Sequence, residues 1–101
     1  MGRISRTRGK RIELAIARYM GMKRNHYEEE DLRGHPVISV EVKHREKHSR
    51  LLVRWFAQAE SAAEDGKTAT LVLHEERQEY GDSYVVMRLR DLRAIIGTGE
   101  R

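Results

Sequence analysis

An alternating segment near the middle of the chain constrains the fold most. Between Val37 and His44, apolar and polar residues take turns, which is the period of a β-strand with one buried face. Three apolar side chains share one face and three polar ones share the other: Ile38, Val40 and Val42 against Ser39, Glu41 and Lys43. The sequence therefore predicts a half-buried strand that displays an acidic and a basic group side by side.

A helix is predicted on each side of this strand. Residues 10–20 carry apolar side chains at helical spacing, and Gly21 follows as a stop signal. The second helix begins after Ser49, a favourable N-cap, and ends before Gly66. Its apolar stripe is strong and consists of Leu51, Leu52, Trp55, Phe56, Ala59, Ala62 and Ala63.

The remaining segments complete an α/β pattern. Residues 23–34 are polar and support at most a short strand, whereas 68–74 and 83–89 are typical of strands with a turn at Gly81 and Asp82 between them. Asp91 caps a short helix that ends before Gly97. The expected order is α-β-β-α-β-β-α, and a mixed β-sheet flanked by helices is the simplest layered arrangement for it.

Length and composition narrow the class of protein. With 101 residues the chain has room for one domain, expected over residues 10–97, between a basic N-terminal arm at 1–9 and a tail at 98–101. The formal net charge of +4 favours an anionic partner such as nucleic acid. Disulfides and thiolate metal sites are excluded because cysteine is absent. No segment reaches the ~20 apolar residues of a membrane span, so a cytoplasmic protein without a membrane partner is expected.

The chemistry is concentrated around Glu41 and Lys43. Side chains two positions apart on a strand lie about 6.5 to 7 Å apart on one face, so neither group is forced into a tight ion pair. Asp31 precedes this strand by a short turn that contains Gly34. If residues 31–33 enter the sheet beside Glu41, two carboxylates converge, and the main-chain carbonyl of Val42 can add a further oxygen. Hard oxygen ligands of this kind suit Mg²⁺ or Mn²⁺.

Such a set of groups matches the needs of phosphodiester hydrolysis. The reaction requires an activated water, neutralisation of the charge that grows on the phosphate, and stabilisation of the leaving alkoxide. A divalent ion on Asp31 and Glu41, with Lys43 beside it, meets these requirements. The alternative is a solvated salt-bridge pair, since an acidic residue two positions before a lysine is common in charged strands.

These residues carry a resemblance to a known family. The pattern Asp31, then Glu41-Val42-Lys43, with Glu13 on a preceding helix, resembles the PD-(D/E)xK nucleases, especially the small Holliday junction resolvases of archaea and phages. The similarity extends from about Gly9 to His74 and includes the Trp55-Phe56-Ala57-Gln58-Ala59 segment. It implies a restriction-endonuclease-like fold, hydrolysis of DNA with a divalent metal, and a homodimer with two active sites.

The resemblance also implies a role for each matched residue. Asp31 and Glu41 become metal ligands and Lys43 the catalytic lysine. Glu13 matches a glutamate that such enzymes often add to the metal shell, and Gln58 matches a polar residue near the site of related nucleases. This chain departs from the family in having no proline before Asp31 and in a short, acidic preceding span, which leaves neighbouring Glu30 as an alternative ligand.

Basic residues on both sides of the motif are candidates for phosphate contacts. They are Arg3, Arg6, Arg8, Lys10 and Arg11 before the first helix, and Arg45, Lys47, Arg50 and Arg54 after the strand. The alternatives are a solvated chain end and a wet charged face. Trp55 and Phe56 suit base stacking, although core packing is favoured. His44 and His48 are four apart, but a break between strand and helix falls near them, which argues against zinc.

The predicted function is a Mg²⁺-dependent, structure-selective DNA endonuclease. Its expected substrate is a four-way junction, as in DNA recombination and repair, in a host cytoplasm if the gene is a phage's. An endonuclease for duplex, nicked or flapped DNA is the nearest alternative, and a non-catalytic basic DNA-binding module is the alternative from another class. No small-molecule substrate is expected.

Overall fold

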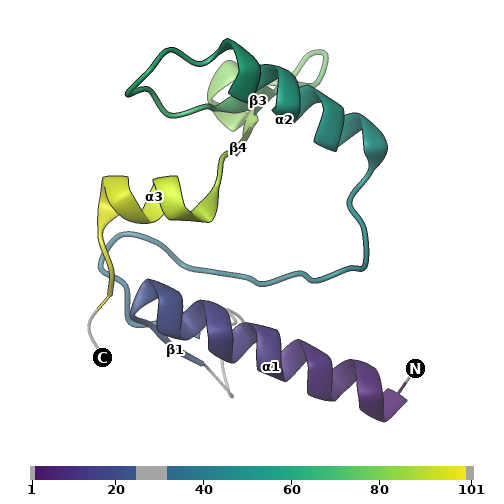
Figure 1. Ribbon diagram of the computed structural model, residues 1–101, viewed down its shortest axis with the longest axis vertical. Coiled ribbons are helices and arrows are strands. Elements are labelled where there is room, and N and C mark those ends of the chain that lie inside the picture. The colour runs from purple at the N-terminus through teal and green to yellow at the C-terminus, as the bar shows by residue number, and fades with distance from the viewer. Residues whose placement is uncertain (1, 25–31, 100–101) are drawn as a thin grey trace. The chain divides into compact units, whose positions relative to one another are not determined.

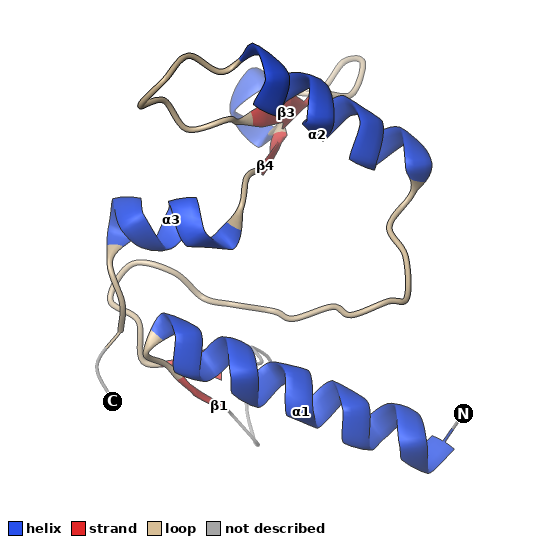
Figure 2. Cartoon of the chain, in the orientation of Figure 1, coloured by secondary structure: helices blue, strands red, loops and turns tan. Residues whose placement is uncertain are grey.

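The computed structural model describes residues 2–24 and 32–99, with side chains from Gly9 onward (Figures 1 and 2). Within these ranges, three α-helices and two separate two-stranded antiparallel sheets follow in the order α-β-β-α-β-β-α, which confirms the predicted order. The chain divides into two compact units. The first unit comprises Met1–Glu46 and Ile95–Arg101, and the second unit comprises Lys47–Ala94.

Helix α1 (Gly2–Met20) begins eight residues before the predicted start at Lys10. The added residues contain no proline, and their arginines are good helix formers, so nothing in this stretch stops the helix. The segment expected to be an N-terminal arm is thus the first part of α1. The helix ends at Met20, and the next residue, Gly21, has a φ of 66°, which favours glycine. A Cβ there would also lie 2.5 Å from the carbonyl oxygen of Gly99.

The first unit has a small closed core. Ala17, Met20, Met22 and Leu32 are buried, and Met20 and Leu32 are fully so. Five half-buried side chains pack against this cluster: Ile16, Ile38, Val40, Val42 and Ile96. The apolar face predicted for the alternating segment is therefore confirmed, because all three of its members contact the core.

The sheet in this unit is smaller than predicted. Strand β1 (Lys23–Arg24) pairs antiparallel with β2 (Leu32–Arg33), in the register Lys23↔Arg33 and Arg24↔Leu32. The segment 37–44 is not a regular strand, since its one ladder contact is an isolated antiparallel bridge between Val40 and Leu32. Strand pairing can extend only as far as the partner strand, and β2, the partner of residues 37–44, is two residues long. Consequently no single mixed sheet forms among the described residues.

Helix α2 (Arg50–Ala62) opens the second unit and begins as predicted. The Ser49 hydroxyl accepts a hydrogen bond of 3.1 Å from the N–H of Leu52, which satisfies one of the free donors of the first turn. Four of the seven residues of the predicted apolar stripe are half-buried, namely Leu52, Phe56, Ala59 and Ala63. Leu51 and Trp55 stay exposed, and no residue of α2 is fully buried.

A short hairpin and a helix follow. Strand β3 (Leu71–Leu73) pairs antiparallel with β4 (Tyr84–Val86), and both are shorter than the predicted strands. The connection contains a 3₁₀ turn, η1 (Tyr80–Asp82). Helix α3 (Leu89–Ile96) begins two residues before Asp91, which therefore lies in the first turn and not at the cap.

Among residues 2–24 and 32–99, no helix combines the length and the apolar character that crossing a bilayer requires.

Candidate functional site

Glu41 and Lys43 lie on the solvent side of the alternating segment, opposite the side chains that pack on the core. The Lys43 Nζ is 3.9 Å from the Glu41 Oε1, and the two side chains are 87% and 54% exposed. Charge-assisted hydrogen bonds are about 2.7 to 2.9 Å long, so this contact leaves both groups able to bind something else. The prediction that the acid and the base share the polar face is confirmed.

Asp31, the second predicted carboxylate, lies outside the described residues, as does Glu30. Its neighbour Leu32 is described and places β2 beside the motif. The Leu32 N–H donates a 3.1 Å hydrogen bond to the carbonyl oxygen of Val40, the residue before Glu41. Leu32, the first described residue of the 31–33 segment, therefore lies beside the motif as predicted.

Glu13 has a partner that the sequence did not suggest. Its carboxylate accepts a hydrogen bond of 2.5 Å from the Arg24 Nε, and the two side chains are 22% and 19% exposed. The contact joins α1 to β1. Glu13 can therefore bind a metal only if it shares or leaves Arg24, and its place in the metal shell stays a prediction. The Val42 carbonyl likewise stays a prediction as a metal ligand, and the Val42 side chain packs on the core.

Metal-ligating side chains do not cluster in threes among the described residues. No third histidine, aspartate or glutamate of the described residues joins Glu13, Glu41, His44 or His48 in such a cluster. Asp31 lies outside these residues. Of the predicted centre, the structure thus brings Glu41 and Lys43 together.

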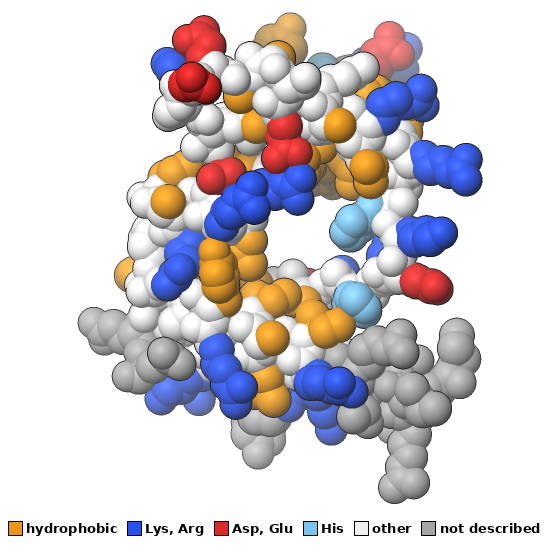
Figure 3. Space-filling view, viewed as in Figure 1, with side chains coloured by type: hydrophobic (Ala, Val, Ile, Leu, Met, Phe, Trp, Pro, Cys, Tyr) orange, Lys and Arg blue, Asp and Glu red, His pale blue; other side chains and the backbone are white. Residues whose placement is uncertain are grey.

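The candidate phosphate-binding residues fall into two groups. Arg3, Arg6 and Arg8 belong to α1, and their side chains lie outside the described set. The others are exposed: Lys10, Arg11, Arg45, Lys47, Arg50 and Arg54. Figure 3 shows that Lys and Arg side chains stand out from the face that it draws. Arg50 and Arg54 are neighbours on the surface of α2, because they are four residues apart.

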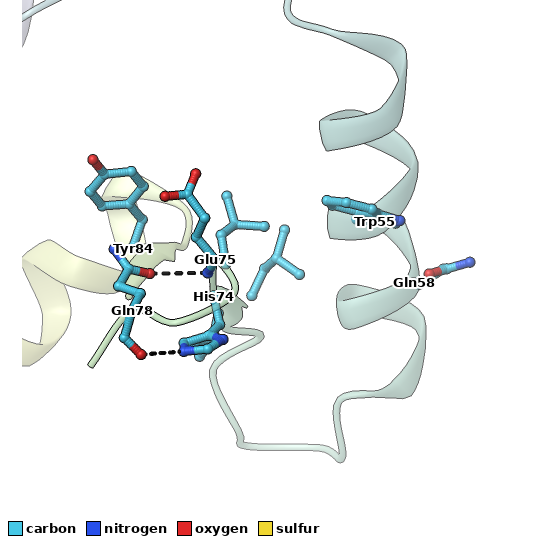
Figure 4. A pocket seen from close by; sticks show the side chains of 9 residues that line it. Trp55, Gln58, His74, Glu75, Gln78 and Tyr84 are labelled. Atoms are coloured by element: carbon cyan, nitrogen blue, oxygen red, sulfur yellow. Dashed lines mark hydrogen bonds between the residues drawn. The ribbon is translucent and has the colours of Figure 1, made fainter. Parts of the chain in front are cut away.

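The second unit contains a pocket of about 580 Å³ between α2 and the hairpin (Figure 4). Trp55 projects from α2 toward the hairpin, whereas the amide of Gln58 points away from it. Gln58 is thus part of the pocket lining although its amide is turned outward, and its catalytic role stays a prediction. The hairpin side is lined by four side chains with polar groups that were not predicted as site residues: His74, Glu75, Gln78 and Tyr84. The polar run directly after β3 was the sequence feature that could have indicated them, but it was interpreted only as a turn.

A second acid–base pair, Glu60 and Arg88, lies in the second unit. The Arg88 guanidinium donates two hydrogen bonds to the Glu60 carboxylate, of 2.8 and 3.0 Å, and sits 5.3 Å from the Phe56 ring centroid. These hydrogen bonds hold the pKa of Glu60 below its usual value and raise the pKa of Arg88. The pair ties α2 to the chain just before α3.

Comparison of this chain with family models, with curated proteins and with solved structures finds no match. Its function must therefore be inferred from the chemistry of its own residues.

Proposed function

We propose that this chain is a Mg²⁺- or Mn²⁺-dependent DNA endonuclease of the PD-(D/E)xK class that cuts branched DNA, with four-way junctions as the principal substrate. One observation carries the proposal. Glu41 and Lys43 project together from a segment whose other face is held by the core, and their contact of 3.9 Å leaves both groups open.

The proposal adds Asp31 to this pair by extending the pairing of Leu32 with Val40 by one residue. Directly opposite residues of an antiparallel pair point to the same face, so Asp31 would share the face of Glu41. Glu41 itself suits a hard cation, because its side chain is 54% exposed and the Lys43 ammonium approaches its carboxylate only to 3.9 Å. In this proposal Asp31, Glu41 and the Val42 carbonyl hold the ion, and Glu13 joins them when it leaves Arg24.

The bound ion would activate a water molecule and stabilise the leaving alkoxide. The chain's own groups do the rest. The Lys43 ammonium orients the attacking water and offsets the negative charge that develops on the phosphate. The buried face of the segment limits how far Glu41 and Lys43 can move, because Val40 and Val42 are packed on the core between and beside them. The restriction-endonuclease-like fold is part of the same proposal.

The basic residues around the motif support binding of a DNA backbone. Arg45, Lys47, Arg50 and Arg54 are exposed and follow Lys43 within a short stretch. Cations of this kind bind phosphates without reading base sequence, which suits an enzyme that recognises the shape of its substrate. Two copies of the chain would supply one active site for each of the two strands cut at a junction.

A labelled four-way junction tests the proposal. We expect cleavage with Mg²⁺ or Mn²⁺, and binding without cleavage when Ca²⁺ replaces them. Lys43→Ala removes cleavage and leaves junction affinity largely intact, whereas the matched control Lys67→Ala, at an exposed lysine outside the proposed site and the proposed DNA contacts, retains cleavage. A wild-type protein that binds DNA but cuts nothing with any of these metals would be a basic DNA-binding module. Duplex, splayed and flap substrates in the same assay decide which DNA structure is preferred.

A further inference from the structure

The pocket of the second unit has the size and chemistry of a ligand site. Its volume of about 580 Å³ lies within the roughly 300 to 1,000 Å³ of pockets for small ligands. Leu71 and Leu73 are half-buried and supply apolar surface, and Trp55 closes the side formed by α2 (Figure 4).

Trp55 provides a flat surface for stacking. It is the chain's single tryptophan, it projects toward the hairpin, and it is 42% exposed. The helical spacing of Trp55 and Phe56 predicts core packing for both residues. Phe56 is half-buried and lies close to Arg88, but Trp55 keeps its ring accessible at the pocket. Aromatic rings in this state are typical platforms for unpaired bases.

Hydrogen bonds hold the hairpin side of the pocket in place. The Gln78 side-chain oxygen accepts from the Glu75 N–H at 3.0 Å, and its amide nitrogen donates to the Asp82 carbonyl at 3.0 Å. The His74 ring lies 2.8 Å from the Gln78 carbonyl oxygen. The polar atoms of Gln78 are therefore committed to the loop, and its conformation is set before any ligand arrives.

Glu75 adds an exposed carboxylate to the pocket lining. Its main-chain N–H is bound by Gln78, and its side chain is exposed at the pocket. An ionised carboxylate only accepts hydrogen bonds, so a partner must bring N–H or O–H donors. Every DNA base has an N–H donor on its Watson–Crick edge, namely the exocyclic amino groups of cytosine, adenine and guanine and the N3–H of thymine, whereas N3-methylthymine has none.

We propose that this pocket binds one unpaired nucleobase, with the base stacked on Trp55 and an N–H of its Watson–Crick edge donating to Glu75. Charge supports a nucleotide over an apolar peptide, because the exposed Arg50 and Arg54 precede Trp55 on α2. The inference rests on the proposed function for its ligand, since splayed and flapped DNA contain unpaired bases, and a four-way junction exposes them where base pairs open at its crossover.

The fluorescence of Trp55 tests this directly, because no other tryptophan contributes. Short oligothymidine should quench it at low salt in EDTA, where no cleavage occurs, and the same oligonucleotide made of N3-methylthymidine, which has no N–H donor, should bind several-fold more weakly. Glu75→Ala should abolish this preference, while Glu79→Ala, in the same loop but outside the pocket lining, should keep it. Trp55→Ala should weaken binding of a labelled oligothymidine roughly tenfold, in line with the usual strength of stacking.

Equal quenching by the two oligonucleotides, no quenching, or an unchanged preference in Glu75→Ala would overturn the pocket assignment. Circular dichroism checks that each variant is folded, and Glu75→Ala changes only an exposed side chain. The nuclease proposal fails separately, since it predicts that Lys43→Ala loses cleavage and quenches like the wild type. Quenching in a wild-type protein that never cuts DNA would uphold the pocket and reject the nuclease.

Discussion

Two acid–base pairs, one in each unit, show how the same kinds of side chain acquire different roles. Glu41 and Lys43 approach only to 3.9 Å and are largely exposed. Glu60 and Arg88 form two hydrogen bonds of 2.8 and 3.0 Å, and their pKa values move apart accordingly. The second pair has used its hydrogen-bonding capacity on itself, whereas the first keeps that capacity for a ligand.

The difference follows from geometry and residue type. Arginine presents a planar fork that matches both carboxylate oxygens, whereas lysine carries a point charge on a flexible stem. Glu41 and Lys43 are also neighbours on one extended segment, which separates their Cα atoms along one face. We call the pair of Glu60 and Arg88 closed and the pair of Glu41 and Lys43 open. The pair between Glu13 and Arg24 is also closed, because an arginine contacts the carboxylate directly. A close ion pair is therefore evidence of structure, and an open one is a candidate for chemistry.

The largest expected effect comes from replacing the basic residue of each pair by alanine and measuring cleavage. Lys43→Ala should reduce cleavage of a four-way junction by about a hundredfold or more, the usual cost of removing a group that stabilises a transition state. Its melting temperature should stay unchanged, because the Lys43 side chain is 87% exposed. Arg88→Ala should show the opposite pattern, with cleavage retained in the folded protein. Equal loss of cleavage in both variants would contradict the distinction.

The core beneath the open pair provides the next test. Leu32 is fully buried and pairs with Val40, so Leu32→Ala should lower the free energy of unfolding by about 2 to 5 kcal/mol. The matched variant Leu51→Ala removes a side chain that is 45% exposed in the second unit and should cost much less. Urea denaturation measures both. A similar cost for the two substitutions would show that the closed core does not lie behind Glu41.

The arginines of α2 test which cations are open to DNA. Arg54→Ala and Arg50→Ala should each reduce the dependence of log K on log salt by about one phosphate contact. Arg88→Ala should leave this slope unchanged, because Glu60 already binds its guanidinium. Fluorescence anisotropy with a labelled junction at several salt concentrations gives the slopes. If Arg88→Ala changed this slope as much as Arg54→Ala does, the distinction between an arginine held by a carboxylate and an arginine open to DNA would be wrong.

The smallest effect concerns the closed pair itself. The pKa of Glu60 lies below its usual value because Arg88 donates to the carboxylate, so the contribution of the pair is present above the usual glutamate pKa. It is lost as the pH falls through the lowered pKa. Carboxyl NMR shifts should show the pKa of Glu60 rising toward its ordinary value in Arg88→Ala. An unchanged titration would mean that another group lowers it.

Local patterns predicted much of this structure. The alternation from Ile38 to Lys43 gave the correct inward and outward faces, and Ser49 caps α2 as expected. Such features depend on residues close in sequence, so they can be read from a single chain. The element order was predicted for the same reason.

Features that depend on distant partners could not be predicted. A regular strand was expected at 37–44, but its extent is set by β2, which offers only Leu32 as a bridge partner. The contact between Glu13 and Arg24 crosses from α1 to β1 and has no sequence signature. The accessible ring of Trp55 was also missed, because its helical spacing is the same as that of the half-buried Phe56.

Paramagnetic broadening by Mn²⁺ tests most directly whether Asp31 and Glu41 share a cation. Amide signals should broaden first around Asp31, Glu41 and Val42 when Mn²⁺ is added in small amounts, and Asp31→Asn together with Glu41→Gln should abolish the effect. The closed pair of Glu60 and Arg88 should remain sharp throughout. Broadening centred elsewhere, or unaltered by the double substitution, would contradict the proposed metal site and with it the nuclease.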